Sequence, residues 1–439
     1  MKKLRLTAFV LAILMLLASC GGSKPAETTS PQTSATTEAS TQATTEATTE
    51  ATTAPQIKAE EWVIITSFSE VNANYWKATS YLADAIDAIT GKYPELVDDI
   101  SYKEDKYGEN VGKVYLGNTK FDPSAELKAL GLGTVGYAYK VNSPLEIAIC
   151  SATDYALVKA VKAFCADVLG YDGETVPEEM TLTVGAQYLY DGDYEIDLTG
   201  YELVFEDEFE GTELDLEKWE HRGLGERRGG YNSSETVSVR DGSLVIKYGY
   251  LEDGEYGEGW YAGMIRAKER FLRGYFEVRM ICVDQKPANF WSAFWLQGNH
   301  PYDELSYGGI GSAEIDIVEA FREGLNKDGP MQMTSTVHCF GYAEGGMSSA
   351  LRSSPTNCVP VEDMCTAYHT YGLEWTEDEY RFFLDGKCVY ELVWADGITT
   401  DMEEMVVSLE IPGEDDCEKA DKSISGEMFV DYVKVYQIP

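Results

Sequence analysis

Three carboxylates stand close together in a segment that otherwise has the composition of a buried strand. The segment is Glu314-Ile315-Asp316-Ile317-Val318-Glu319, and its β-branched residues predict a strand. Alternate side chains of a strand point to opposite faces, so Glu314 and Asp316 share one face and Glu319 lies on the other. One extra residue, a β-bulge at Val318, would return Glu319 to the face of the first two. Glycoside hydrolysis with retention needs two such groups, one as nucleophile and one as proton donor.

Two other interpretations account for the same carboxylates. Acidic side chains can alternate on the solvent face of an amphipathic strand, and carboxylates can gather around a calcium ion. Six residues alone leave all three interpretations open.

The first twenty residues have the features of an export signal. Lys2, Lys3 and Arg5 form a basic start, and the apolar run 6–17 is too short to span a bilayer. The following Leu17-Ala18-Ser19-Cys20 resembles the lipobox of bacterial lipoproteins, in which the chain is cut before a cysteine that is then lipidated. We therefore expect a lipid anchor on Cys20, and an extracellular protein held to a bacterial membrane without a transmembrane helix. An ordinary cleaved signal peptide is the alternative.

Residues 21–58 predict a flexible linker. Ser, Thr, Ala and Glu dominate this segment, and it shows no apolar period that could support a core. A coil of this length reaches roughly 30 to 40 Å, enough to hold a folded domain away from a cell surface.

Composition narrows the range of partners. The 35 Lys and Arg residues against 75 Asp and Glu give a net charge of −40. Such a surface repels nucleic acid and anionic membranes and offers a sulfated polymer no general attraction, so a neutral polysaccharide is favoured.

Without Cys20 eight cysteines remain, with no Cys-x-x-Cys spacing and only four histidines, so zinc is not expected. We expect most of these cysteines to be buried and the protein to be a monomer.

Residues 59–195 predict a small α+β accessory domain. Strands are expected at 62–65, 113–116, 137–141 and 145–149. Tyr75, Leu82 and Ile86 fall on one face of a helix that ends at Gly91, and a second helix begins with Asp154 as its N-cap. No acid/base cluster occurs here, so a structural or spacing role is expected, with carbohydrate binding as the alternative.

Residues 196–439 have a different pattern. Helical periodicity nearly disappears, and short runs rich in Val, Ile, Tyr, Phe and Trp alternate with Gly, Asp and Asn. Asp385-Gly386 between two such runs predicts a tight hairpin. A segment of this length and pattern predicts an all-β, two-sheet sandwich.

The segment also resembles glycoside hydrolase family 16. The motifs that carry the resemblance are 203–209, 231–245, Phe290-Trp291-Ser292-Ala293-Phe294-Trp295-Leu296, the carboxylate segment, 369–376 and 430–436. The resemblance implies a concanavalin-like jelly roll with a cleft on its concave face. It also implies Glu314 as nucleophile, Glu319 as general acid/base, Asp316 between them, and His338 as a hydrogen-bonding residue near the acid/base. The extra residue in the carboxylate motif resembles the laminarinase-like, bulged branch.

The same resemblance suggests binding residues. Trp260, Trp291 and Trp295 are candidates for stacking on sugar rings, with one of the three expected in the core, and Tyr231 is a further candidate. Glu208, Gly242 and Asp431 match the positions that hold a structural calcium in many family members; catalysis needs no cofactor. The Gly- and Ser-rich segment 341–358 is expected to form a long loop over the cleft.

The leading expectation is a retaining, endo-acting hydrolase of β-1,3-linked or mixed β-1,3/1,4-linked glucan. One alternative keeps this mechanism but acts on a galactan such as agar or carrageenan. The other is a surface polysaccharide-binding protein without catalysis, because a jelly roll can host either function.

Overall fold

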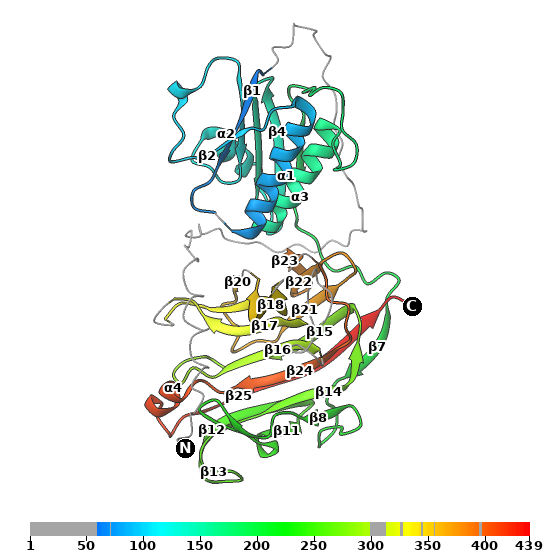
Figure 1. The fold of residues 1–439 in the computed structure, drawn as a ribbon. Coiled ribbons are helices and arrows are strands. Elements are labelled where there is room, and N and C mark those ends of the chain that lie inside the picture. The colour runs from blue at the N-terminus through cyan, green and yellow to red at the C-terminus, as the bar shows by residue number, and fades with distance from the viewer. Residues whose placement is uncertain are drawn as a thin grey trace, which may run out of the picture.

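A computed structural model describes residues 59–70, 72–298, 313–324, 328–343, 346–354, 356–394 and 397–439. The expected signal peptide, Cys20 and the linker lie outside these residues. The described residues form a domain of helices on one mixed parallel and antiparallel sheet, followed by a two-sheet β-sandwich (Figure 1). None of the described helices combines the length and hydrophobicity needed to cross a membrane.

The first domain is built on one sheet with the strand order β2-β1-β3-β5-β4-β6 among the described residues. Its strands are β1 (Glu61–Thr66), β2 (Glu95–Asp98), β3 (Val111–Leu116), β4 (Tyr137–Ser143), β5 (Glu146–Ser151) and β6 (Gln187–Tyr190). The helices are α1 (Ala73–Thr90), α2 (Asp122–Lys128) and α3 (Asp154–Phe164), with a 3₁₀ turn η1 (Glu104–Lys106) and a π-helical segment η2 (Cys165–Leu169) that continues α3. Helices α1 and α3 share one apolar core with the sheet, and α2 contributes Leu127 to a second core.

Local sequence explains the helix ends. The side chain of Asn72 accepts a hydrogen bond from Tyr75 N at the start of α1, and Gly91 ends the helix at a φ of 71°. The N-cap of α3 is Thr153, whose side chain accepts from Ala156 N. The prediction that Asp154 caps this helix is therefore wrong; Asp154 lies one residue inside it and accepts from Asn74 Nδ2 at 3.2 Å.

Two sheets make up the second domain. Within the described residues the larger sheet has eleven strands: β7 (Glu202–Asp207), β9 (Gly225–Arg227), β10 (Gly230–Asn232), β11 (Val237–Arg240), β12 (Ser243–Gly254), β13 (Gly257–Ala262), β15 (Gly274–Ile281), β21 (His369–Trp375), β22 (Tyr380–Leu384), β23 (Lys387–Leu392) and β25 (Ser425–Gln437). The smaller has eight: β8 (Trp219–His221), β14 (Met264–Phe271), β16 (Trp291–Gly298), β17 (Ala313–Arg322), β18 (Met331–Ala343), β19 (Gly346–Ser353), β20 (Asn357–Pro360) and β24 (Glu403–Glu410). The turn η3 (Ser234–Thr236) and the helix α4 (Glu414–Lys419) complete the domain.

The chain passes repeatedly between the two sheets, as in a jelly roll, and the two-sheet sandwich predicted from the sequence is confirmed. Phe276 and Val278 of the larger sheet belong to one buried core with Ile315 and Ile317 of the smaller sheet. The Asp385-Gly386 hairpin has positive φ at both residues, 50° and 79°, as a type I′ turn requires.

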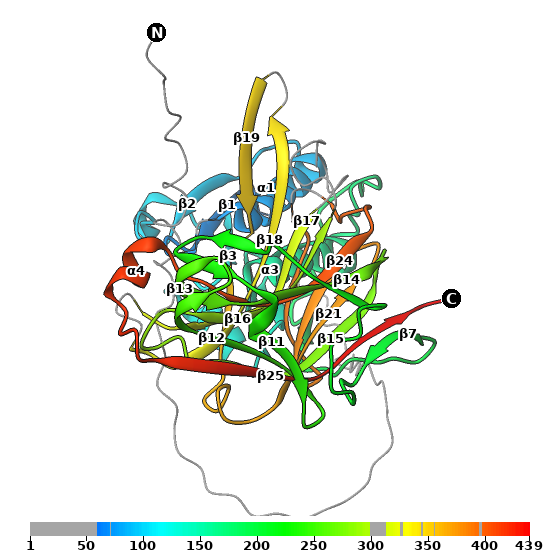
Figure 2. The ribbon, with the colours of Figure 1, turned by 90° about the horizontal axis from the view of Figure 1, so that it is seen from below.

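One predicted loop is wrong. Most of the segment 341–358 forms strands: β18 pairs with β19, and β20 pairs with the other half of β18. The β18–β19 hairpin extends beyond the rest of the sheet (Figure 2). The Gly- and Ser-rich sequence of this hairpin has low strand propensity, which is why a loop was predicted. In the structure, pairing with the neighbouring strand gives the segment its strand conformation.

The two domains contact one another through α3 and β23 (Figure 1). Lys159 Nζ of α3 lies 2.8 Å from Glu391 Oε2 and 3.2 Å from Glu379 Oε2, and both glutamates are almost fully buried. Tyr155 and Tyr194 donate hydroxyl hydrogen bonds to the same two carboxylates.

The seven cysteines whose side chains are described form no disulfide with one another. Five of them are buried, and burial of most cysteines was expected from the sequence.

Candidate active site

The carboxylate segment is strand β17, and it carries the predicted bulge. Against β16, Phe294 pairs with Val318 and Trp295 pairs with Asp316, which leaves Ile317 without a partner. The residue left over on this side is thus Ile317 rather than Val318.

The other neighbour of β17 shows the same irregularity. Along β18, Thr336 pairs with Asp316 and Thr334 pairs with Glu319, so three steps on β17 match two steps on β18. Ser335 lies opposite the bulge and donates its hydroxyl to Ile317 O at 2.8 Å. The strand therefore turns Ile317 and Val318 toward the core, while Glu319 returns to the face of Glu314 and Asp316.

Glu319 is held by a tryptophan of the neighbouring strand. Trp291 Nε1 donates to Glu319 Oε1 at 3.0 Å. Burial, followed by the charge of Asp316, raises the pKa of Glu319, and the Trp291 bond opposes this only in part. The indole nitrogen is a donor only, so Oε1 must accept and a proton on this carboxyl resides on Oε2. The geometry therefore favours Glu319 as a carboxylic acid with a defined proton position.

Glu314 is held by an amide. Gln297 Nε2 donates to Glu314 Oε2 at 2.7 Å. Burial and then the charge of Asp316 raise the pKa of Glu314, whereas His338 and Arg222 lower it. The bond from Gln297 occupies Oε2, which makes Oε1 the candidate oxygen to act on a substrate.

Asp316 and His338 form a buried pair. His338 Nε2 lies 3.0 Å from Asp316 Oδ2, and His338 Nδ1 lies 2.7 Å from Ser353 Oγ. Burial lowers the pKa of His338, but the hydrogen bond to Asp316 and its charge outweigh burial and raise this pKa to about 8. At neutral pH the imidazolium donates from both nitrogens and balances the charge of Asp316, which is only 6% exposed.

The side chains of Glu314, Asp316 and His338 bring three potential metal-ligating atoms within 4.8 Å of one another. Each of the three groups already has a protein partner: Gln297, His338 and Ser353, respectively. Hydrogen bonding between these residues is enough to explain the arrangement.

The three candidate tryptophans have different environments. Trp260 is in the sandwich core, 2% exposed, with its Nε1 donating to Cys417 O, so it cannot stack on a substrate. Trp291 and Trp295 lie on the carboxylate face of β16, and each ring is covered by a guanidinium: Arg228 lies 4.7 Å from the ring centre of Trp291, and Arg222 lies 4.6 Å from that of Trp295.

The remaining predicted residues lie away from this face. The ring of Tyr231 packs against the rings of Tyr256 and Tyr261. In the expected calcium set, Glu208 accepts from Lys434 at 3.0 Å and Asp431 from Arg279 at 2.5 Å, and Gly242 has a φ of 73°. A calcium ion held by the Asp431 side chain and by the backbone carbonyls of Glu208 and Gly242 would have to displace Arg279 from Asp431; calcium binding there stays a prediction.

Three further residues of the site were not singled out from the sequence. Gln297 follows Trp295 by two residues on the same strand, so alternation puts it on the same face as Trp295, a predicted binding residue. Ser353 is opposite His338 only because of the unpredicted β18–β19 pairing. Arg222 lies just beyond β8, about ninety residues before the carboxylates, and no local pattern indicates its place.

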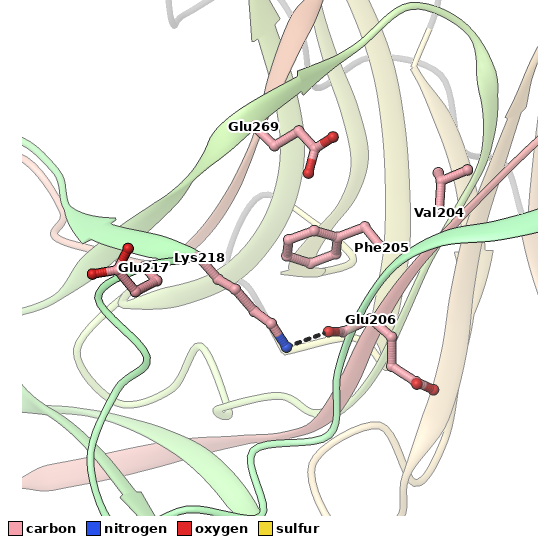
Figure 3. A pocket seen from close by; sticks show the side chains of 6 residues that line it. All are labelled: Val204, Phe205, Glu206, Glu217, Lys218 and Glu269. Carbon is pink, nitrogen blue, oxygen red and sulfur yellow. Dashed lines mark hydrogen bonds between the residues drawn. The ribbon is translucent and has the colours of Figure 1, made fainter.

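A surface pocket beside β7 and β8 is separate from this site (Figure 3). It is lined by Val204, Phe205, Glu206, Glu217, Lys218 and Glu269. Lys218 Nζ crosses it to donate to Glu206 O at 2.7 Å, and none of the lining residues belongs to the carboxylate cluster.

The family model that matches this chain covers the β-sandwich domain. Residues 203–438 match a family model described as the GH16 domain of β-porphyranases A–D. The glucan endo-1,3-β-glucosidase A1 of Niallia circulans is 25% identical over 272 residues, 55% of this chain and 38% of that protein. The endo-1,3-1,4-β-glycanase ExsH of Rhizobium meliloti is 29% identical over 210 residues, 46% of this chain and 39% of that protein. The chain thus spans about two fifths of the length of these two relatives.

A further relative is the β-porphyranase E of Zobellia galactanivorans, 29% identical over 189 residues, 42% of this chain and 65% of that protein. Among solved structures, porphyranase B of Z. galactanivorans is 23% identical with a TM-score of 0.44, covering 54% of this chain and 92% of that one. The non-specific endo-β-1,3(4)-glucanase SCLam is also 23% identical, with a TM-score of 0.45 over 56% of this chain and 96% of that one.

Proposed function

This chain belongs to glycoside hydrolase family 16, and we propose that it is an endo-acting, retaining enzyme with Glu314 as nucleophile and Glu319 as general acid/base. The observation that carries the proposal is the bulge in β17, which puts both glutamates and Asp316 on one face. Each glutamate is oriented by a donor from β16, Gln297 or Trp291.

In the first step, Glu314 Oε1 attacks the anomeric carbon while the bond from that carbon to the glycosidic oxygen breaks. The proton on Glu319 Oε2 passes to the departing oxygen. The products are a glycosyl ester on Glu314 and a free alcohol.

In the second step, Glu319 takes a proton from water, and the water oxygen attacks the same carbon and releases Glu314. The electrostatics support this change of role, because the charge of Glu314 is one of the contributions that raise the pKa of Glu319. Once Glu314 is an ester, this contribution is gone and Glu319 ionises more easily, as a base requires. Asp316 keeps the imidazolium of His338 as its counter-charge throughout.

For the substrate we propose a β-1,3-linked or mixed-linkage β-glucan. The support is the names of two relatives, an endo-1,3-β-glucosidase and an endo-1,3-1,4-β-glycanase, together with the strong negative charge of the whole chain.

A galactan is the second candidate, and two observations favour it. The matching family model is that of porphyranases. The carboxylate face also carries arginines on the side of β8, β9 and β14. They are Arg222, Arg227, Arg228, Arg266 and Arg270, each paired with Glu404 or Glu410.

The test is product release by the purified protein on laminarin, mixed-linkage β-glucan, agarose, carrageenan and porphyran in parallel. Short oligosaccharides of several lengths from laminarin or mixed-linkage glucan, absent with Glu314→Gln, are expected. Products from a galactan alone would keep the mechanism and change the substrate. Tight binding without any product would favour the non-catalytic binding protein and contradict the proposal.

The location is a separate proposal. We propose that the protein is exported and held to the membrane by lipid on Cys20, on the basis of the basic start and the Leu17-Ala18-Ser19-Cys20 motif. Cys20→Ala should release the protein from the membrane fraction without changing its specific activity. An unchanged membrane fraction would contradict the anchor.

A further inference from the structure

Arg222 and Gln297 form a chain of hydrogen bonds that ends on the nucleophile. The guanidinium of Arg222 donates to Gln297 Oε1, and Gln297 Nε2 donates to Glu314 Oε2 at 2.7 Å. Gln297 is 8% exposed, so water does not compete freely for its amide group. The two hydrogen bonds together link Arg222, just beyond β8, to Glu314 on β17. Strands β14, β24 and β16 lie between β8 and β17 in this sheet.

Several contacts fix Arg222 in this position. Its backbone N–H bonds Met264 O at 2.9 Å, its Nη1 lies 3.7 Å from Glu404 Oε1, and its guanidinium stacks on Trp295. Trp295 is itself held by a hydrogen bond from its Nε1 to Ser408 Oγ at 3.1 Å. The guanidinium is therefore a preorganised group rather than a mobile surface charge.

The chemistry of arginine determines which group donates and which accepts in these two hydrogen bonds. A glutamine amide can present either its oxygen or its NH₂ group to a neighbour. Arginine has donors only, so Gln297 must turn its oxygen to Arg222 and its NH₂ to Glu314. An NH₂ donor stabilises an ionised carboxylate, whereas an amide oxygen would instead accept a hydrogen bond from a neutral carboxylic acid.

We propose that Arg222 is a positioning residue for the nucleophile: through Gln297 it keeps Glu314 ionised and its free oxygen turned to the substrate. This inference rests on the proposed role of Glu314 as nucleophile. Arg222 does not touch the reacting atoms; it acts on Glu314 through the amide group of Gln297 and through its own positive charge.

Other charged groups around Glu314 also influence its titration. They are Asp316 and Glu319 on β17, His338 on β18, Glu403, Glu404 and Glu410 on β24, and Arg222 beyond β8. Most of these groups are acidic, and only His338 and Arg222 favour the ionised form of Glu314. Loss of Arg222 should therefore shift the titration of Glu314 toward higher pH.

The first measurement does not depend on activity. In protein labelled with ¹⁵N-glutamine, the side-chain amide signal of Gln297 is identified by its absence in Gln297→Leu, and its titration is followed from pH 4 to 9. Glu314→Gln shows which transition belongs to Glu314. In Arg222→Met we expect that transition to move up by about one pH unit, the shift expected for loss of an opposite charge near a carboxylate.

The matched control is Arg270→Met. Arg270 also pairs with Glu404, at 2.8 Å, so its loss removes the same kind of ion pair from the same glutamate. This variant should leave the Gln297 titration in place, and circular dichroism of each variant checks that it folds. An unmoved transition in Arg222→Met, or an equal movement in Arg270→Met, would overturn the proposal.

The second measurement is kinetic. On the polysaccharide that the wild type cleaves, the acid limb of kcat/KM should move up in Arg222→Met, with a loss of about tenfold on that limb that shrinks as the pH rises. Arg222→Met should move the limb less in a Gln297→Leu background than in the wild type, because only the direct charge of Arg222 then remains to be lost. A loss equal at every pH would show a merely structural role and contradict the inference. If the wild type cleaves nothing, the function proposed above fails, while the titration still decides the role of Arg222.

Discussion

Trp291 and Glu319 lie on adjacent strands and are joined by one hydrogen bond, 3.0 Å from indole Nε1 to carboxylate Oε1. The bond exists only because β17 is bulged, since a regular strand would turn Glu319 into the core. It fixes the proton of Glu319 on Oε2 and links the irregularity of the backbone to the acid/base chemistry.

Trp291→Phe keeps the aromatic ring and removes this donor. The bond lowers the pKa of Glu319, so its loss should raise that pKa further and move the alkaline limb of kcat/KM up by about one pH unit. Trp295→Phe is the matched control, because its N–H bonds Ser408 rather than a carboxylate. An alkaline limb that stays in place in Trp291→Phe, or moves equally in both variants, would contradict the role of the bond.

The two catalytic carboxylates should respond differently to substitution. Glu314→Gln should abolish hydrolysis of every substrate. Glu319→Gln should retain more activity on an aryl glycoside whose leaving group needs no proton than on a polysaccharide, where a loss of about 10²- to 10⁴-fold is expected. Parallel assays on the two substrates check this. Equal losses on both substrates in Glu319→Gln would contradict its role as proton donor.

His338 should stabilise the fold in a pH-dependent way. Its folded pKa of about 8 lies above its ordinary value of 6.5, so the stabilisation is complete below about pH 6.5 and is lost as the pH rises through 8. His338→Gln should therefore lower Tm at pH 6, by the equivalent of about 2 kcal/mol, and much less at pH 9.

The control for this measurement is His221→Gln. Burial lowers the pKa of His221, so its contribution to stability has the opposite dependence: it is complete above the ordinary value of 6.5 and is lost as the pH falls below that value. A Tm difference for His338→Gln that is the same at pH 6 and pH 9 would contradict the charged pair with Asp316.

Glu403 should weaken the fold at neutral pH. It is fully buried, accepts a hydrogen bond from Ala313 N at 2.9 Å, and burial raises its pKa to about 8. Because the unfolded chain releases this proton near pH 4.5, stability is lost as the pH rises from there through 8. Glu403→Gln should raise stability at pH 7 by about 3 kcal/mol and have little effect near pH 4.5.

Glu404 provides the comparison for Glu403. It is the next residue, but it pairs with Arg266 and Arg270 at 3.1 and 2.8 Å, so Glu404→Gln should lower Tm. Thermal unfolding of both variants across pH 4.5 to 8 tests the contrast. A Glu403→Gln effect that does not grow with pH would show that this carboxyl is ionised in the folded protein.

Local sequence was sufficient for features that depend on a few neighbouring residues. The bulge in β17, the Asp385-Gly386 hairpin and the face of α1 that carries Tyr75 and Leu82 follow from strand and helix periods and from turn chemistry. The order of the carboxylates along the strand also indicated which side chains share a face.

Features that depend on distant pairing were not accessible in this way. Strand β16 is buried on both faces, so its alternation does not tell which face carries the site, and Trp260 on β13 looked equivalent to Trp291. The β18–β19 hairpin and the contact of Arg222 with Gln297 join segments through the sheet rather than along the chain. Long-range placement of this kind leaves no local period in the sequence.

The most direct test of the account is the configuration of the first product. Proton NMR of a fresh digest, on the polysaccharide that the wild type cleaves, distinguishes the anomers before mutarotation. Two displacements through Glu314 predict that the newly formed reducing end of a β-linked substrate appears first as the β-anomer and that Glu314→Gln gives no signal. Initial release of the α-anomer would contradict the covalent role of Glu314 and with it the proposed mechanism.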